Sequence, residues 1–240
     1  MDELIIGYDE NIGLPQDFKD TINLQQKCYP NAGLTQMLQD FDAAKISLAF
    51  LPAGTLPYLK STYEVVAQAA LGPQYSNHMV TQLVTAKKIS LPQALASKLG
   101  RVNCYCTTSF WAPLIYIMCH FANDNSVQFI NTNSFQDMLF KVADQKIDSA
   151  MVWDSVLQEH PQAAGKVEAL AVQDDLPTPI IIANRNIPED LKGTLTHFKS
   201  NDKNSYFSGY IVPDLNLINH FKHQMMQANK HFNLGIQFVS

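Results

Sequence analysis

The chain has 240 residues, 46% of them hydrophobic, so it is long enough to bury one large core or two smaller ones. Its 17 Lys and Arg are outnumbered by 22 Asp and Glu, which gives a net charge of −5. Because there is no basic cluster, the composition argues against a nucleic-acid partner and against an anionic membrane surface. No apolar run reaches the about 18 residues of a transmembrane helix.

The predicted elements alternate between strands and helices. Strands are predicted at 4–8, 46–51, 78–86, 101–106, 127–130, 147–152, 167–172 and 178–183. Helices are predicted at 34–41, 58–70, 91–99, 110–121, 135–143, from 155 onward, at 191–198 and at 215–228. This alternation predicts an α/β protein with mostly parallel sheets. We expect the chain to cross twice between two lobes. Residues 1–86 and 178–240 would then form an outer lobe, and residues 87–177 an inserted second lobe.

The sequence feature with the clearest chemistry is Thr107-Thr108-Ser109, where a strand gives way to a helix. The first turn of a helix has unpaired backbone N–H groups and a partial positive charge, and hydroxyl groups add further donors. Such a site suits phosphate, phosphonate, sulfate or carboxylate. Simple helix capping is the alternative, since Ser and Thr are favoured caps.

Other strand ends carry candidate ligand-binding residues. In open α/β sheets, ligands gather beyond the carboxyl ends of strands. Asp154 is predicted at such an end, where it could equally be a helix cap, and Tyr8 ends the first strand. The loop 131–134 is in an equivalent place, and Pro52-Ala53-Gly54-Thr55 forms another strand-to-helix junction.

Signatures of common enzyme classes are absent. The sequence contains no phosphate-binding loop with a Lys, no GxSxG, no HExxH and no GxGxxG. The four cysteines form no CxxC pair and the histidines are scattered, so neither a metal nor a cofactor is expected. A nucleophile at Cys104 or Cys106 remains an alternative.

The order of segments resembles the phosphate, phosphite and phosphonate-binding components of bacterial ABC transporters. Four segments carry the resemblance: 46–59, 99–116, 135–157 and 176–191. The most specific match is the third, FQDMLFKVADQKIDSAMVWDSVL. The resemblance implies a two-lobed type II periplasmic binding protein fold. It also implies that Thr107, Thr108 and Ser109 cradle the anion.

The sequence departs from this family at two positions. Phe135 follows Ser134 where the family often has His, and Thr178 precedes Pro179 where it often has Asp. The segment between the first strand and Leu34 is also short, so we expect the usual first helix to be trimmed. These departures support anion binding better than recognition of an aminoalkylphosphonate.

The resemblance implies a solute-binding protein, not an enzyme, that closes its lobes around a small oxyanion. The expected ligand-binding residues are Thr107, Thr108, Ser109, Tyr8, Tyr58, Ser134, Asp154 and Thr178. The expected partners are the anion and an ABC transporter permease, and the protein is expected to be a monomer. The N-terminal MDELIIGYDE lacks an intact secretory signal, so we expect a periplasmic protein whose signal was removed, or a cytoplasmic one. The other two readings are a Cys-dependent enzyme similar to thiamine-precursor or thiaminase-type proteins, and an interaction protein that has lost its ligand.

Overall fold

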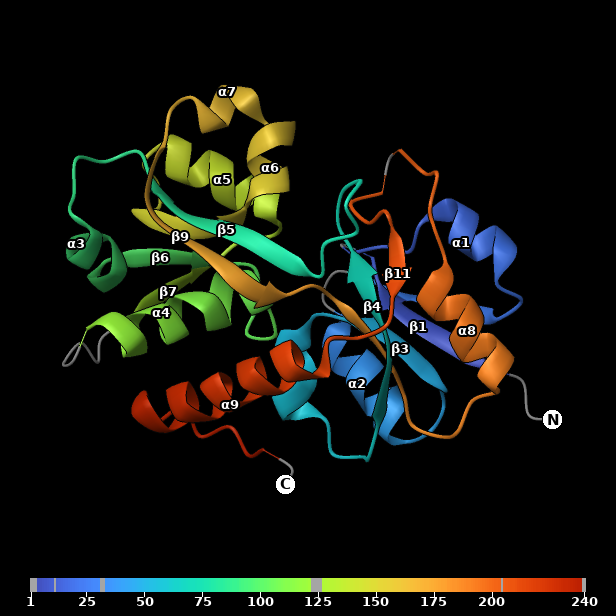
Figure 1. Cartoon of the computed structure of the whole chain (residues 1–240). Helices are drawn as coiled ribbons and strands as arrows, with labels where there is room; N and C mark the ends of the chain where they lie inside the picture. Colours follow the sequence, from blue (N-terminus) through green and yellow to red (C-terminus); the bar gives the residue numbers. More distant parts are fainter. Residues whose placement is uncertain (1–3, 11, 31–32, 122–126, 204, 239–240) are drawn as a thin grey trace. The chain divides into compact units, whose positions relative to one another are not determined.

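The computed structural model describes residues 4–10, 12–30, 33–121, 127–203 and 205–238. The chain forms two compact units, each with its own sheet (Figure 1). Unit 1 contains residues 1–78, 177–219 and 237–240, and unit 2 contains residues 79–176 and 220–236. This division places 79–86 and 220–236 in unit 2, whereas the sequence analysis assigned both segments to the outer lobe. The first of them belongs there because residues 81–84 pair with residues 150–153.

Unit 1 is built on a six-stranded mixed sheet in the order β11-β4-β10-β3-β1-β2. Its strands are β1 (Ile5–Asp9), β2 (Gln25–Tyr29), β3 (Leu48–Leu51), β4 (Glu64–Ala70), β10 (Ile180–Ala183) and β11 (Gly209–Ile211). β1 pairs in parallel with β2 and β3, while β10 is antiparallel to β3 and β4, and β11 to β4. The helices are α1 (Gln16–Thr21), α2 (Leu34–Asp42), the 3-10 helix η1 (Ala53–Tyr58) and α8 (Glu189–His197).

The core of unit 1 follows from the apolar pattern of these elements. β3 and β10 are buried along their whole length, as expected for central strands covered on both faces. α2 buries Leu34, Met37, Leu38 and Phe41, which recur at helical spacing. An edge-to-face aromatic cluster adds Phe18 packed on Tyr210, with ring centroids 4.9 Å apart.

Unit 2 is built on a five-stranded sheet in the order β7-β6-β8-β5-β9. Its strands are β5 (His78–Thr85), β6 (Lys98–Arg101), β7 (Gln128–Asn131), β8 (Ser149–Trp153) and β9 (Glu168–Pro177). β6 pairs in parallel with β7 and β8, whereas β5 is antiparallel to β8. The helices are α3 (Leu91–Ala96), the π-helix η2 (Thr107–Trp111), α4 (Ala112–His120), α5 (Phe135–Ala143), α6 (Asp154–Glu159) and α7 (Pro161–Ala164).

The core of unit 2 joins α5 to the sheet. Buried Met138, Leu139 and Val142 of α5 pack in one cluster with Ala150 and Val152 of β8. Gly100 in β6 allows this approach, because a Cβ there would lie 2.9 Å from Cγ of Met138. The long helix α9 (Leu215–His231) runs from unit 1 into unit 2. In the described part of the chain, no helix is both long and apolar enough to cross a membrane.

The expected helix at 58–70 is wrong. The chain instead forms η1 up to Tyr58 and the strand β4 from Glu64. Ala-rich residues favour a helix locally, but β4 gains two antiparallel partners, β10 and β11, and is buried from Val66 to Ala70. Tertiary pairing therefore overrides the local propensity.

Three further expectations need correction. The strand expected at 101–106 lies earlier in the chain, as β6 (Lys98–Arg101). Cys104 and Cys106 therefore lie in the loop that follows it and not on a strand. Both sheets are mixed, not mostly parallel, because β5, β10 and β11 join antiparallel. The segment before Leu34 does contain a six-residue helix, α1, and the strand β2, and the sequence analysis predicted neither of them. It also missed the short strand β11.

Candidate functional site

The carboxyl ends of three parallel strands meet at one edge of the unit 2 sheet. Thr107 follows β6 after a short loop, Ser134 follows β7, and Asp154 follows β8 directly. Since β6 pairs in parallel with both β7 and β8, these three loops emerge on the same side. This is the kind of sheet edge at which open α/β proteins bind ligands. The structure thus brings together Thr107, Thr108, Ser109, Ser134 and Asp154.

The trio Thr107-Thr108-Ser109 forms the first turn of η2, which continues into α4. All three residues are buried, with at most 2% of each exposed. Cys106 caps this turn, because its Sγ accepts the backbone N–H of Ser109 at 3.3 Å. The thiol also lies 3.3 Å from Oγ1 of Thr108. A cap is therefore present, but the side chain that provides it is a cysteine and not one of the three hydroxyl residues.

The hydroxyl groups of the trio also hold neighbouring loops. Oγ of Ser109 accepts the backbone N–H of Val102 at 3.0 Å, which closes the loop between β6 and η2. Oγ1 of Thr108 accepts the indole N–H of Trp153 at 3.2 Å, which links η2 to the end of β8. In both bonds the hydroxyl oxygen is the acceptor, so the hydroxyl hydrogen of Ser109 can still donate to an oxyanion.

Trp153 connects the three loops of this edge. Its indole N–H reaches Thr108, and its ring lies 5.7 Å from the ring of Phe135, the first residue of α5. Asp154 next to it accepts a hydrogen bond from the side-chain amide of Gln82 at 2.8 Å. Trp153 is not among the ligand-binding residues expected from the sequence. Its contacts, which determine its position, are with residues distant in the sequence.

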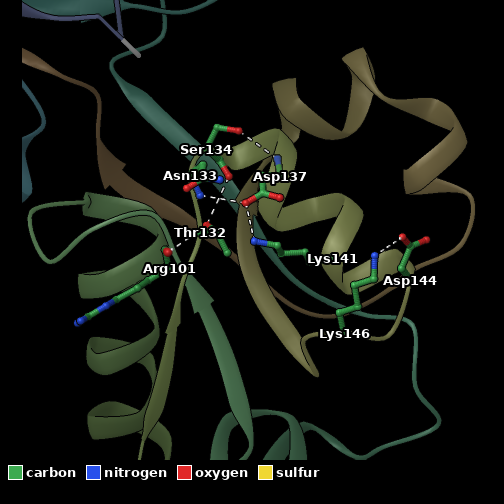
Figure 2. Close-up of polar contacts among 8 residues, drawn as sticks. All are labelled: Arg101, Thr132, Asn133, Ser134, Asp137, Lys141, Asp144 and Lys146. Atoms are coloured by element: carbon green, nitrogen blue, oxygen red, sulfur yellow. Dashed lines mark hydrogen bonds and ion pairs between the residues drawn. The ribbon is translucent and has the colours of Figure 1, made fainter. Parts of the chain in front are cut away.

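The loop that contains Ser134 is closed by reciprocal capping (Figure 2). Oγ of Ser134 accepts the backbone N–H of Asp137 at 3.0 Å, and Asp137 accepts the backbone N–H of Asn133 at 3.0 Å. The ammonium group of Lys141 lies 2.7 Å from the same carboxylate. The hydrogen bond from Asn133, and then that from Lys141, hold the pKa of Asp137 below its ordinary value. Ser134 is thus the N-cap of α5, which lowers the energy of the helix start.

Arg101 is a cation at this sheet edge that the sequence analysis did not select. Its Nε donates to Oδ1 of Asn131 at 2.8 Å, and its guanidinium group lies 5.3 Å from the ring of Phe110 and 5.1 Å from that of Phe129. Figure 2 shows the guanidinium group directed away from Asp137. A guanidinium group packed against two neighbouring rings is restricted in orientation, which suits recognition of an anion.

The other predicted residues belong to unit 1. Tyr8 precedes the last residue of β1, and Tyr58 ends η1, which follows the parallel strand β3. Burial, and then the neighbouring Cys28, raise the pKa of Tyr8, and the ammonium group of Lys19 lies 5.1 Å from its ring. Tyr8 therefore lies near the carboxyl end of β1, and Tyr58 lies beyond the carboxyl end of its parallel neighbour β3, so both are at the same edge of the unit 1 sheet.

Thr178 has a different environment from these tyrosines. It is fully buried, and its hydroxyl group donates to the carbonyl oxygen of Ala69 at 2.6 Å and lies 3.2 Å from that of Asn77. It therefore ties the end of β4 to the start of β10. No group of three His, Cys, Asp or Glu that could hold a metal ion occurs among the residues that the structure describes.

Comparison with known proteins confirms the expected fold. No family model and no curated protein matches the sequence. Solved structures do match, including a binding protein component of an ABC phosphonate transporter from Pseudomonas aeruginosa, with a TM-score of 0.75 and 13% identity over 98% of this chain and 90% of that chain.

PhnD1 from Prochlorococcus marinus in complex with methylphosphonate has a TM-score of 0.70 and 12% identity, covering 95% of this chain and 98% of that one. XAC2383 from Xanthomonas citri bound to ATP has a TM-score of 0.74 and 11% identity, covering 96% and 99%. The chain therefore has the two-sheet α/β fold of periplasmic binding proteins, and the resemblance inferred from sequence is confirmed at the level of the fold.

Proposed function

We propose that the protein is a solute-binding protein that holds a small oxyanion, such as a phosphate or phosphonate group, at the start of η2. The observation that carries this proposal is the run Thr107-Thr108-Ser109, placed at the carboxyl end of β6 where a helix begins. Backbone N–H groups of the first turn and the hydroxyl hydrogens would donate to the anion oxygens. Recognition by neutral donors agrees with a chain whose net charge is negative.

The remaining predicted residues have supporting roles in this proposal. Ser134 and Asp154 lie at the same sheet edge as the trio, and Asp154 would accept a hydrogen bond from a ligand OH or NH group. Tyr8, Tyr58 and Thr178, which belong to unit 1, are the other proposed ligand contacts. The two similar structures named above with methylphosphonate and ATP are consistent with a ligand that carries phosphonate or phosphate.

Calorimetric titration of the Thr108→Val variant tests the proposal. Valine has nearly the same shape as threonine but can neither donate to an anion nor accept the indole N–H of Trp153. A hydrogen bond to a charged group contributes about 1.5–3 kcal/mol. We expect the affinity for the best of phosphate, methylphosphonate, sulfate and ATP to fall by about tenfold or more. The matched control is Thr194→Val, which changes an exposed hydroxyl group on α8 and should leave the affinity unchanged.

Two results of this titration would contradict the proposal. One is that none of the four anions produces heat or a thermal shift in the unmodified protein, which would favour an interaction protein that has lost its ligand. The other is that Thr108→Val binds as well as the unmodified protein.

Because Phe135 replaces the His of the similar family, 2-aminoethylphosphonate should bind no more tightly than methylphosphonate.

A cysteine-dependent enzyme is the second candidate, and Cys106 is the residue that it would use. Its thiol lies at the start of the helix, within the proposed anion site. A thiol nucleophile needs a base to accept its proton, but the hydrogen-bonding groups next to Cys106 in the described chain are the N–H of Ser109 and the hydroxyl of Thr108. Faster alkylation of the buried Cys106 than of the exposed Cys28 would favour the enzyme.

The transport role and the location in the cell follow from the same proposal. A periplasmic binding protein delivers its ligand to a membrane permease, so an ABC transporter permease is the proposed partner and the periplasm the proposed location. Co-purification of the protein with a permease, in the presence and absence of methylphosphonate, would test this partnership. The proposed solution state is a monomer, which the molar mass from light scattering would check.

A further inference from the structure

An aromatic pair lies next to the hydroxyl trio at the carboxyl edge of the unit 2 sheet. Trp153 ends β8 and Phe135 begins α5, and their ring centroids are 5.7 Å apart at an interplanar angle of 49°. The indole N–H of Trp153 donates to Oγ1 of Thr108 at 3.2 Å. Thr108, Trp153 and Phe135 thus form a continuous row, in which aromatic surface begins where the proposed anion donors end.

Both rings are partly exposed, although each belongs to an element that supplies core residues. Met138 of α5 and Val152 of β8 are 0% exposed, whereas Phe135 and Trp153 pack only against the rim of this core. The other tryptophan of the chain, Trp111, is fully buried. An aromatic ring that leaves part of its surface in water gains stability when a ligand covers that surface.

The groups beside the pair disfavour a charged or strongly polar substituent on the ligand. Asp154, next to Trp153, accepts the side-chain amide of Gln82 at 2.8 Å, and its carboxylate would repel a second anionic group. The side chain of Phe135 has no donor or acceptor for a polar group. Two tilted rings form one wall, whereas a cation is typically held in a cage of several aromatic faces.

We propose that the ligand is a phosphonate or phosphate monoester with an aromatic substituent, whose ring packs on Trp153 and Phe135 while the hydroxyl trio holds its oxyanion. This inference rests on the proposed function, because it assigns a ligand class to the same site. The aromatic pair then acts as a specificity determinant, since inorganic phosphate and sulfate carry no group that can cover it.

Calorimetric titration with methylphosphonate and phenylphosphonate, at a pH where both are dianions, tests the inference. The two ligands share the oxyanion and differ only in the substituent, so the ratio of their dissociation constants reports on the aromatic wall. We expect phenylphosphonate to bind about tenfold more tightly than methylphosphonate.

Phe135→Leu is the test variant, because leucine keeps an apolar side chain against the core but removes the ring. It should weaken phenylphosphonate binding by about threefold to tenfold and leave methylphosphonate binding unchanged. The matched control is Phe140→Leu, which removes an exposed ring from the same helix and should change the affinity for neither ligand.

Tryptophan fluorescence provides a second readout. Of the two tryptophans, Trp153 is partly exposed and Trp111 is buried, so acrylamide should quench mainly Trp153. Bound phenylphosphonate should protect Trp153 from acrylamide more strongly than bound methylphosphonate does. Trp153→Phe should remove the protected component of the fluorescence.

Three results would overturn the inference while leaving the proposed function in place, because the anion still binds in each. They are equal affinity for the two phosphonates, equal weakening of both by Phe135→Leu, and tighter binding of phosphocholine, which carries a cation in place of the ring, than of phenylphosphonate. Absence of binding by either phosphonate contradicts the proposed function itself, and this inference with it.

Discussion

At the scale of single residues, Asp40 stands out as a buried carboxylate with several partners. Its side chain is 4% exposed and accepts hydrogen bonds from Lys27 at 2.7 Å, Tyr29 at 2.8 Å and Gln36 at 2.9 Å. The bond from Lys27 holds the pKa of Asp40 well below its ordinary range, and burial, followed by the bond to Asp40, raises the pKa of Tyr29 to about 12. These contacts tie β2 to α2 in unit 1.

We predict that Asp40→Asn lowers the free energy of unfolding at pH 7 by about 2 kcal/mol, the size of a hydrogen bond to a charged group. A carboxyl group whose pKa is lower in the folded state contributes stability above its unfolded pKa and loses it as the pH falls through the folded value. The unmodified protein should therefore lose stability below about pH 4, and Asp40→Asn should lose less.

Urea unfolding at several pH values measures both effects. Asp20→Asn, which changes an exposed carboxylate of α1, is the matched control and should keep the pH dependence of the unmodified protein. The interpretation of Asp40 is wrong if Asp40→Asn retains the full loss of stability at acid pH.

At the scale of elements, the start of α5 serves two roles that substitutions can separate. Ser134 caps the helix, so Ser134→Ala should lower the free energy of unfolding by about 1 kcal/mol. Aspartate is an equally good cap and interacts favourably with the helix dipole, so Ser134→Asp should keep the stability. If Ser134 also faces the proposed anion, the added negative charge of Ser134→Asp should weaken methylphosphonate binding.

Thermal unfolding and calorimetry distinguish the two roles of Ser134. Ser90 caps α3 in the same unit with a capping box, and it lies outside the proposed binding site. Ser90→Asp is therefore the control for the added charge, and it should leave the anion affinity unchanged. Full anion affinity in Ser134→Asp would show that Ser134 is a cap and no more.

At the scale of the whole molecule, the proposed function requires the two units to move. Solute-binding proteins of this fold class close around the ligand by rotation about the segments that connect the lobes. We predict that methylphosphonate lowers the radius of gyration measured by small-angle X-ray scattering. Thr108→Val should show this change only at higher ligand concentration, and an unchanged radius at saturation would contradict closure.

The sequence predicted the local elements best where one pattern dominated. α2 and α5 were recognised because apolar residues recur at helical spacing, and β3, β8 and β10 because their apolar runs are short and continuous. The candidate anion site was also visible, since three hydroxyl residues before an apolar helix are unusual for a simple cap. That information lies within a few neighbouring residues.

β4 and β2 were missed because their secondary structure depends on distant partners. Glu64–Ala70 has helix-forming alanines, and only its pairing with β10 and β11 makes it a strand. β2 has four exposed residues and no apolar pattern, and it is held by its parallel pairing with β1. Whether a sheet is mixed also depends on distant partners, because a strand is parallel or antiparallel only relative to the strands with which it pairs.

The sequence by itself determined the alternating strands and helices, the resemblance to phosphonate-binding proteins and the position of the hydroxyl trio at a helix start. Only the tertiary structure decided what those hydroxyl groups contact. It places Trp153 against Thr108, Val102 against Ser109, and a thiol at the cap. It also brings together residues of α4, β9 and α9, which are far apart in the sequence, around one cavity. The reason is physical: propensity and periodicity act over one or two turns, whereas a binding site is formed where distant strand ends and helices pack together.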